Sequence, residues 1–333
     1  MIDNLQRPIF ICLTPARNEA WILETFIKYN SLWADYIIIL DQMSTDQTKE
    51  VCDRYDHVIR IENNSLIFNE DERQIRLIEE ARKIEAEKRI IIALDADEVL
   101  SSNVTLSQEW ETIKQLPEGT VLKFPWFNVD ENKKEGWFTE SPVAFGFVDD
   151  GSAHLPQKIH STRVPVPPHA SFYCTKEIVN LHFQYIDPER NRKKQRWYMC
   201  WEHINFPDKH PIDIYRQYNK HYASSIVHQS IIKREWLYNF EEEGRAILNC
   251  KAPDRMWWDE EILDMFENYG TERFKKIDIW DCDWNRISEK DRAIIDPRSP
   301  LDKVILYWLK VTQKEHKKLY NRIFQKILKS LWK

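Results

Sequence analysis

The first hundred residues alternate between short, mainly apolar runs and longer stretches with apolar residues at every third or fourth position. The runs are rich in β-branched residues. A strand that is apolar throughout is buried on both faces, which is typical of the parallel sheets of α/β proteins. Four such strands are predicted, at 9–13 (IFICL), 36–40 (YIIIL), 57–61 (HVIRI) and 90–94 (IIIAL).

Helices are predicted between these strands. Residues 19–30 begin with an acidic first turn, which suits the positive end of a helix dipole. A serine or threonine is placed to cap a helix over 46–55. A third helix is predicted by an apolar stripe made of Ile75, Ile78, Ala81 and Ile84. The order β-α-β-α-β-α-β favours an α/β fold with an open, mostly parallel sheet flanked by helices.

A polar segment follows the first, second and fourth of these strands. The segments are TPARNEA at 14–20, DQMSTD at 41–46 and DADE at 95–98. Open α/β sheets bind their ligands outside the carboxyl ends of their parallel strands. One charged turn at a strand end arises easily by chance, whereas three at the same edge of a sheet indicate a site.

The composition and the residue pattern of the chain change after this region. Residues 117–183 are rich in proline and aromatic residues, which predicts further strands and long loops, and the pattern after 187 is mostly helical. The sequence therefore predicts two parts. They are a first domain at 1–185, with halves at 1–105 and 106–185, and a mainly helical C-terminal region at 186–333.

The end of the chain, residues 310–333, has the pattern of a basic amphipathic helix. Apolar residues recur along one face, and eight basic residues stand against the single acid Glu315, which gives the segment a net charge of +7. Such a helix can lie in the interface of an anionic membrane, or its apolar face can pack on the rest of the protein. Both interpretations stay open.

Composition restricts the class of protein. The 333 residues are 42% hydrophobic and 31% charged, without any apolar run long enough to span a membrane, so we expect a soluble globular protein. The first residues lack the pattern of a signal peptide, and the six cysteines form no C-x-x-C pair, so reduced thiols in the cytoplasm are expected. A net charge of −6 gives no reason to expect a nucleic acid partner.

Glycine is scarce. Only six glycines occur, and none lies in the first 118 residues. A phosphate cradle made of glycine backbone, such as the dinucleotide fingerprint or the P-loop, is therefore excluded from that part of the chain. If these residues bind a phosphorylated ligand, another group must neutralise its charge.

Asp95 and Asp97 offer such a group. Residues two apart on an extended segment share a face, so both carboxylates can approach one cation, and hard oxygen ligands favour Mg²⁺ or Mn²⁺. A divalent ion with few protein ligands keeps coordination positions for phosphate oxygens. The alternative is a solvated acidic turn that caps the next helix.

The three polar segments, in this order and spacing, resemble the family 2 glycosyltransferases of bacterial type. The resemblance covers residues 8–105 and implies a GT-A-like fold with a Rossmann-like nucleotide-binding half. It also implies transfer of a sugar from a nucleotide-sugar donor, UDP-linked, with inversion at the anomeric carbon. The family segment DDGSTDGT stands here as DQMSTDQT, with its second acid and both glycines replaced.

Residue roles follow from this resemblance. Asp41 would accept a hydrogen bond from the base, and Arg73 would lie near the nucleotide. Asp95 and Asp97 would be the metal-binding acids, and Asp95 would also contact the nucleotide. The nucleoside pocket would be lined by Thr14, Pro15, Arg17 and Glu19.

Further ligands are expected beyond residue 180. The resemblance implies that His182, at the end of a predicted strand, is a third metal ligand, although a histidine beside apolar residues is more often a satisfied core group. Basic residues follow it and can bind the donor diphosphate. Lys194 and Arg196 are the principal candidates, with Arg192 and Lys193 beside them.

An inverting transfer needs a general base, and adjacent acids suit this task because their repulsion raises one pKa. Asp150 is the first candidate and Asp149 the second, although an ordinary Asp-Gly turn explains them equally well. The other candidates are Glu140, His154 and His160. Trp126 and Trp137 are placed to stack on a sugar acceptor.

These observations predict a metal-assisted glycosyltransferase acting on a glycan or lipid-linked acceptor, in the synthesis of a cell-surface polysaccharide or lipopolysaccharide. Two alternatives use the same residues. Asp95 is also compatible with the nucleophile of a haloacid-dehalogenase-like phosphatase, but such enzymes carry it on their first strand. The basic tail is compatible with a non-enzymatic adaptor that binds the inner surface of the membrane.

Overall fold

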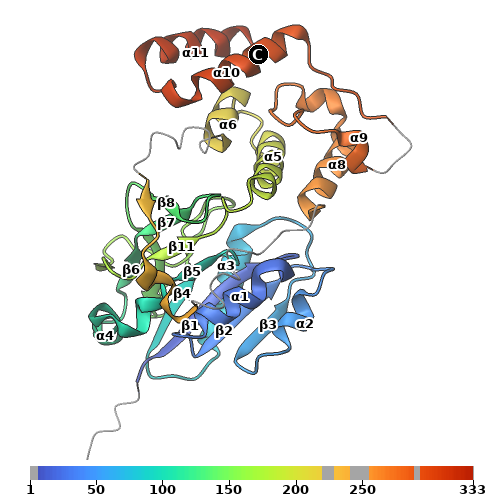
Figure 1. Ribbon diagram of the computed structural model, residues 1–333. Helices are drawn as coiled ribbons and strands as arrows, with labels where there is room; N and C mark the ends of the chain where they lie inside the picture. The colour runs from blue at the N-terminus through green and yellow to red at the C-terminus, as the bar shows by residue number, and fades with distance from the viewer. Residues whose placement is uncertain (1–6, 220–228, 241–254, 289–292, 333) are drawn as a thin grey trace, which may run out of the picture. The chain divides into compact units, whose positions relative to one another are not determined.

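The computed structural model describes residues 7–219, 229–240, 255–288 and 293–332 (Figure 1). These residues form two compact units, divided between Asp187 and Pro188. The first, called the sheet unit, contains the described residues up to 187 together with 229–240. The second, called the helical unit, contains the rest. Unlike the predicted region 186–333, the helical unit does not include 229–240.

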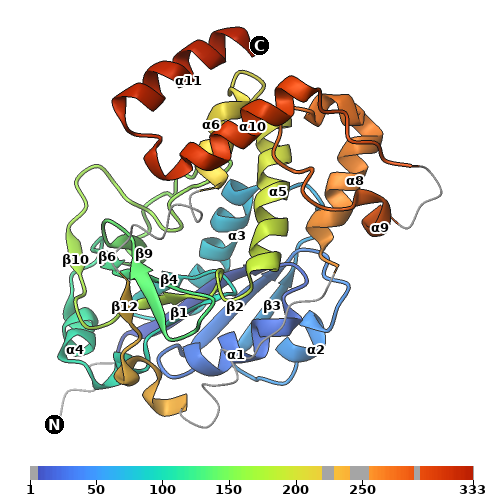
Figure 2. The ribbon, with the colours of Figure 1, turned by 45° about the horizontal axis from the view of Figure 1, so that its top comes forward.

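A seven-stranded sheet is the main feature of the sheet unit, in the order β10-β6-β9-β4-β1-β2-β3 (Figure 2). All neighbouring strands pair in parallel except β9, which runs antiparallel to β4 and β6. The predicted open, mostly parallel sheet is therefore confirmed. Its strands are β1 (Ile9–Ala16), β2 (Tyr36–Asp41), β3 (Val58–Glu62), β4 (Arg89–Ala93), β6 (Val121–Phe124), β9 (Val143–Val148) and β10 (Phe172–Cys174).

Helices cover both faces of this sheet, as the apolar strands require (Figure 2). Successive residues of β1 show the alternation: Phe10 packs with α1 and α4, whereas Ile11 packs with α3. In α3 the buried stripe contains Leu77 in place of the predicted Ile75, which is exposed. The helices are α1 (Ala20–Asn30), α2 (Thr48–Cys52), α3 (Glu70–Arg82), α4 (Gln108–Gln115) and the 3₁₀ helix η1 (Ser102–Leu106).

The N-terminus of α1 differs from the prediction. Glu19 occupies the N-cap position, outside the first turn, and the N–H of Ala20 donates to Asp46 Oδ2 at 3.0 Å. The other carboxylate oxygen of Asp46 accepts from the N–H and the hydroxyl of Thr48. Asp46, the second acid of the segment DQMSTD, therefore stabilises the starts of two helices. The second of them, α2, begins two residues later than predicted.

A second sheet has five strands in the order β12-β8-β7-β11-β5. β11 pairs in parallel with β7 and antiparallel with β5, which places His182 level with both Asn128 and Glu98. A Cβ at Gly136 would lie 2.1 Å from the carbonyl oxygen of Asn128, so the pairing of β7 with β8 requires glycine there. The strands are β5 (Glu98–Leu100), β7 (Trp126–Val129), β8 (Glu135–Phe138), β11 (Asn180–His182) and β12 (Ser230–Ile231), followed by the 3₁₀ helix η3 (Arg234–Phe240).

The helical unit contains only helices and loops among its described residues, so the predicted C-terminal helical region is confirmed. Aromatic side chains fill its interior, with Phe266 in ring contact with Phe274, Trp280 and Trp284. None of the described helices of the chain is long and apolar enough to cross a membrane. The helices are α5 (Pro188–Asn205), α6 (Pro211–Tyr218), α8 (Trp257–Tyr269), η4 (Thr271–Phe274), α9 (Trp284–Ser288), α10 (Pro300–Thr312), η5 (Gln313–Glu315) and α11 (Leu319–Leu331).

Candidate functional site

The polar segments after β1 and β2 lie together at the carboxyl edge of the large sheet and are joined by hydrogen bonds. The N–H of Asn18 donates to Ser44 Oγ at 2.8 Å, and Asn18 Oδ1 accepts from the N–H of Thr45 at 2.7 Å. Asn18 has a positive φ of 56°, a conformation that asparagine tolerates better than most residues. The sequence analysis did not single out Asn18.

The four residues predicted to line a nucleoside pocket occupy the end of β1 and the turn that follows. Thr14 and Pro15 are in the strand, and the Thr14 side chain is buried. Arg17 and Glu19 are half-buried in the turn, where Glu19 accepts a hydrogen bond from the indole N–H of Trp21 at 2.7 Å. Their roles in nucleotide binding stay predictions.

Asp41, the residue predicted to meet the base, is buried at the end of β2. Arg60 of β3 donates to one of its carboxylate oxygens at 2.8 Å, and the N–H of Ser44 donates to the other at 3.1 Å. Both contacts hold the carboxylate in one orientation at the sheet edge. The pairing with Arg60 could not be predicted, because the sequence does not show which residue of the next strand faces Asp41.

Gln42 replaces the second acid of the family segment and has a structural role. Its amide group donates to the carbonyl oxygens of Ser65 and Ile67, at 2.8 Å and 3.0 Å, and so holds the loop after β3. Its Oε1 lies 3.4 Å from Nη1 of Arg73. Arg73 also lies over the ring of Phe68, at 4.6 Å from the ring centre, and is thereby placed beside the end of β2.

The segment DADE lies between β4 and β5, and an arginine pairs with two of its acids. Arg163 Nη2 lies 2.8 Å from Asp95 Oδ2 and 3.2 Å from Glu98 Oε1, and Arg163 Nη1 bonds Glu98 Oε2. Glu98 also accepts the N–H of Asp95 at 2.9 Å. The guanidinium stacks on Phe145, with 4.9 Å to the ring centre. Arg163 is therefore a site residue that the sequence analysis missed.

Burial and neighbouring charges shift the pKa of two residues of this cluster, Glu98 and Arg163. Burial raises the pKa of Glu98 to about 7, an effect that Arg163 reduces and the charge of Asp95 reinforces. Burial alone would lower the pKa of Arg163, but the two carboxylates outweigh burial and raise it above its usual value. Arg163 stays a cation in this environment, so it neutralises charge among the acids that the sequence analysis left to a metal ion.

His182 faces Asp97 from the neighbouring strand. His182 Nδ1 lies 2.8 Å from Asn128 Oδ1, so a hydrogen bond to this oxygen requires a proton on Nδ1. In a neutral imidazole the lone pair is then on Nε2, which lies 3.8 Å from Asp97 Oδ1. Both side chains are buried. The cross-strand register of β11 with β7 produces this arrangement.

Asp97 and His182 fit a divalent cation, whereas Asp95 is paired with Arg163. Two ligands at about 2.1 Å from one ion can lie no more than about 4.2 Å apart, and the pair is within that limit. A carboxylate and an imidazole suit Mn²⁺. Among the described residues, no three His, Cys, Asp or Glu side chains converge in the manner of a metal site. The three-ligand site therefore stays a prediction.

Aromatic rings continue the site from His182. Trp126 stacks on His182 with ring centres 4.9 Å apart, and Trp137 contacts Tyr185 at 4.8 Å. Tyr185 is in turn edge-on to His182 at 6.1 Å. The two tryptophans predicted to contact an acceptor thus lie in one row with the histidine.

Asp149 and Asp150, the predicted general bases, lie at the edge of the large sheet opposite to the carboxyl ends of its parallel strands. They follow β9, whose antiparallel pairing brings Asp149 beside Arg89 at the start of β4. Burial would raise the pKa of Asp149, but hydrogen bonds from Arg82, at 2.8 Å, and from the N–H of Gly151 outweigh burial and lower it. The assignment of the base to these acids is corrected, because they lie beside the start of β4, whereas the segment DADE follows the end of β4.

Two of the other base candidates are exposed: Glu140 and His160. His154 is buried, and its Nε2 lies 2.9 Å from Gln74 Oε1. Burial is the main cause that lowers the pKa of His154, to about 4. The contact with Gln74 holds the imidazole against α3.

The pKa of His154 predicts a pH dependence of stability. Unfolding restores a pKa near 6.5, so between pH 6.5 and about 4 the unfolded chain binds more protons than the folded chain. The free energy of unfolding should therefore fall as the pH falls through this window, by at most about 1.4 kcal/mol per pH unit for one proton, less solvent screening. Urea unfolding of wild type and His154→Gln at pH 7 and pH 5 measures this, and equal pH slopes would refute it.

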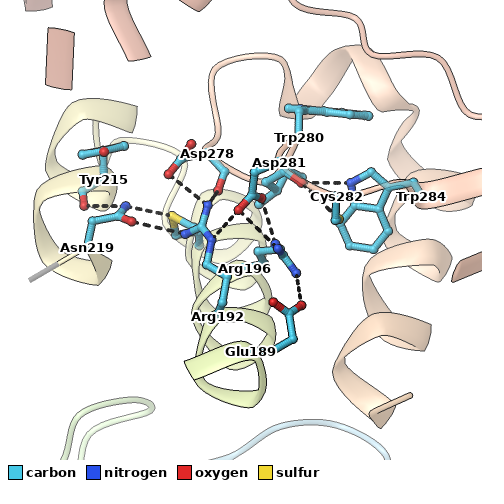
Figure 3. Close-up of polar contacts among 12 residues, drawn as sticks. Glu189, Arg192, Arg196, Tyr215, Asn219, Asp278, Trp280, Asp281, Cys282 and Trp284 are labelled. Carbon is cyan, nitrogen blue, oxygen red and sulfur yellow. Dashed lines mark hydrogen bonds and ion pairs between the residues drawn. The ribbon is translucent and has the colours of Figure 1, made fainter. Parts of the chain in front are cut away.

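Arg196 and Arg192, predicted to bind diphosphate, are held by carboxylates inside the helical unit (Figure 3). Arg196 Nε donates to Asp281 Oδ1 at 2.9 Å, and Arg192 Nε donates to Asp281 Oδ2 at 2.7 Å. Arg192 also donates to the Asp278 carboxylate at 3.0 Å. These two arginines are buried, so the diphosphate assignment of Arg196 is corrected to a structural one.

The neighbouring lysines of α5 differ from each other. Lys193 lies 3.5 Å from Asp259 and is buried. Lys194 is half-buried, and its predicted contact with a diphosphate stays a prediction.

Comparisons with known proteins give little similarity. No protein-family model and no curated protein matches the chain. A mycobacterial protein of known structure is 16% identical, over 37% of this chain and 42% of that chain, with a TM-score of 0.28. A 4-diphosphocytidyl-2C-methyl-D-erythritol synthase is 17% identical, over 44% of this chain and 73% of that chain, also with a TM-score of 0.28.

A third solved structure is the glucosyl-3-phosphoglycerate synthase of Mycobacterium tuberculosis in complex with Mn²⁺, UDP and glucosyl-3-phosphoglycerate. It is 17% identical, over 37% of this chain and 44% of that chain, with a TM-score of 0.25. The chain thus spans less than half of the first and third of these structures. At this level of similarity they assign neither a family nor an activity.

Proposed function

We propose that the protein is a glycosyltransferase that moves a sugar from a nucleotide-sugar donor, UDP-linked, to a glycan or lipid-linked acceptor with inversion. The observation that carries the proposal is the convergence of three polar segments, in family order, on the carboxyl edge of a mostly parallel sheet. The segment DADE continues into a strand that lies beside His182. Synthesis of a cell-surface polysaccharide or lipopolysaccharide in the cytoplasm is the corresponding role.

The donor nucleotide is assigned to the ends of β1 and β2. Arg60 and the N–H of Ser44 fix the orientation of the Asp41 carboxylate, which can then accept a hydrogen bond from the base. Arg73 contacts Gln42, the residue that follows this acid, and offers a positive charge to the nucleotide. Thr14, Pro15, Arg17 and Glu19 form the adjoining wall of the proposed nucleoside pocket.

The diphosphate and the sugar are assigned to the segment DADE. Asp97 and His182 would hold Mn²⁺ or Mg²⁺, with Asn128 orienting the imidazole and Asp95 close by. When bound, the cation neutralises negative charge that develops on the departing diphosphate. Trp126 and Trp137 give the acceptor sugar apolar faces to stack on.

Thermal unfolding in the presence of donors tests the proposal. A UDP-sugar with Mn²⁺ should raise the melting temperature, because a ligand at a hundred times its dissociation constant stabilises the folded state by about 2.7 kcal/mol. The panel also contains GDP-, CMP- and dTDP-sugars, each with Mn²⁺ and with EDTA, and Mn²⁺ alone as the control. If no nucleotide sugar raises the melting temperature in either condition, the proposed function is wrong.

A further inference from the structure

The last helix, α11, lies at the C-terminal end of the chain (Figure 1). Most of its apolar side chains are exposed. Its exposed fractions run from 44% for Phe324 to 75% for Leu331. A surface helix of a globular protein normally turns this stripe toward the core. The exposed apolar residues of α11 are Leu319, Tyr320, Ile323, Phe324, Ile327 and Leu331.

The preceding helix, α10, exposes an apolar row as well. Ile305, Leu306 and Leu309 are buried in the helical unit. On the opposite side of the helix, at a helical spacing of three or four residues, four large side chains are exposed, with fractions between 56% and 67%. They are Leu301, Val304, Tyr307 and Val311. The sequence pattern of the tail gave no indication of this second row.

The exposure does not result from a detached helix, because another face of α11 is bound to the helical unit. Trp332, just after α11, donates from its indole N–H to Asp302 Oδ1 at 2.6 Å and is buried. Lys329 pairs with Asp213 of α6, and Phe324 contacts Trp308 at 4.8 Å between ring centres. The two helices therefore form one fixed element, here called the α10–α11 element, with apolar side chains facing solvent.

The α10–α11 element is also strongly basic. Residues 310–333 carry a net charge of +7 in a chain with a net charge of −6, so the remainder carries −13. The only acid among them, Glu315, already pairs with Lys318. Besides Lys318, six further basic side chains of the element are exposed: Lys303, Lys310, Lys314, Lys317, Arg322 and Lys326.

This charge decides which surface can cover the apolar rows. In a symmetric dimer the element would face a copy of itself, which would bring two surfaces of charge +7 together. A bilayer with anionic lipids instead offers acyl chains to the apolar residues and phosphate groups to the lysines, whose long stems reach past the apolar rows. The negative remainder of the chain is repelled by the same surface, which orients the protein.

We propose that the α10–α11 element binds the surface of an anionic lipid bilayer, with the two helices lying in the interface. The proposal does not depend on the proposed glycosyltransferase activity. If both are correct, the protein acts at a membrane surface, and its acceptor is lipid-linked.

Sedimentation of the full chain with vesicles tests this proposal. The vesicles contain either phosphatidylcholine alone or phosphatidylcholine with about 30 mol% of the anionic lipid phosphatidylglycerol, which gives them a negative surface potential. The test variant is Leu319→Ser/Ile323→Ser/Leu331→Ser, which changes three exposed residues of α11. The matched control is Ile67→Ser/Leu106→Ser/Leu155→Ser, which changes three apolar residues of the sheet unit that are at least as exposed.

Wild type and control should bind the anionic vesicles at least tenfold more tightly than the neutral ones, and binding should weaken as salt is added. The test variant should bind the anionic vesicles at least tenfold more weakly than wild type while keeping its circular dichroism spectrum and melting temperature. Wild type that stays in the supernatant, or a test variant that binds like wild type, would overturn the proposal. So would a lipid-independent dimer, seen by light scattering, that the test variant dissociates, because the face would then belong to a second copy.

Discussion

Arg163→Met is expected to lower the free energy of unfolding by about 3–5 kcal/mol, because it leaves the fully buried Glu98 carboxylate without its cation. Methionine keeps an apolar stem against Phe145, so the loss reports mainly on the charge. Urea unfolding followed by tryptophan fluorescence at pH 8 measures the difference between variant and wild type.

An exposed ion pair of the same chemistry provides the control. Arg7 bonds both carboxylate oxygens of Asp35, at 2.9 Å and 2.6 Å, but its side chain is 70% exposed. Arg7→Met should therefore cost no more than about 1 kcal/mol. The double variant Arg163→Met/Glu98→Gln should recover much of the loss, since neither position then carries a charge. If Arg163→Met and Arg7→Met lower the free energy of unfolding equally, the buried pair stabilises the fold no more than the exposed pair does.

Asp97→Asn is expected to weaken Mn²⁺-dependent binding of the UDP-sugar that raises the melting temperature of wild type most, at least ~100-fold, since removal of an outer-shell partner alone commonly costs 10–100-fold. Asparagine keeps the size of the side chain and removes the charge that faces His182. Binding in the presence of Mn²⁺ and of EDTA is measured by isothermal titration calorimetry. The melting temperature of the unliganded variant shows whether the fold is kept.

Asp150→Asn is the matched control, because the same change is made to an exposed acid at the opposite edge of the sheet. Its binding of the same UDP-sugar and its transfer rate should equal those of wild type. A loss of transfer in Asp150→Asn would restore this acid as a base candidate. Unchanged Mn²⁺-dependent binding in Asp97→Asn would refute the cation site at Asp97 and His182.

The strands and helices of the first hundred residues could be predicted because their signal is local. An apolar run of five residues, such as 36–40, predicts a strand without knowledge of its neighbours, and the buried strand β2 forms there. The order of strands and helices then fixes the edge at which the polar segments meet. Asp41 and Asp95 are at that edge in the structure, as predicted.

Arg163 could not be found in this way. It lies in an irregular segment 65 residues after Glu98 in the sequence, without periodicity or motif to mark it. The same reason applies to Arg192 and Arg196, whose carboxylate partner Asp281 is 85 or more residues away. Basic residues on a helix look solvated until such distant partners are known.

The error at Asp149 has a different physical cause. A strand pattern shows that a segment is extended, but it does not show the direction in which the strand runs in the sheet. β9 runs antiparallel to β4, so its end lies where β4 begins. Acids that follow such a strand meet Arg82 and Arg89 at the opposite edge from the candidate site.

Asn128 of β7 contacts both neighbouring strands of the second sheet, β11 and β8. Its side chain meets His182, while its carbonyl oxygen occupies the space that any Cβ at position 136 would need. A lineage that acquired a larger residue at 136 would lose the hairpin and the orientation of the imidazole in one step. Natural variation in relatives should therefore be concentrated in the turn at 130–134, with glycine retained at 136 in a chain that otherwise uses this residue so rarely.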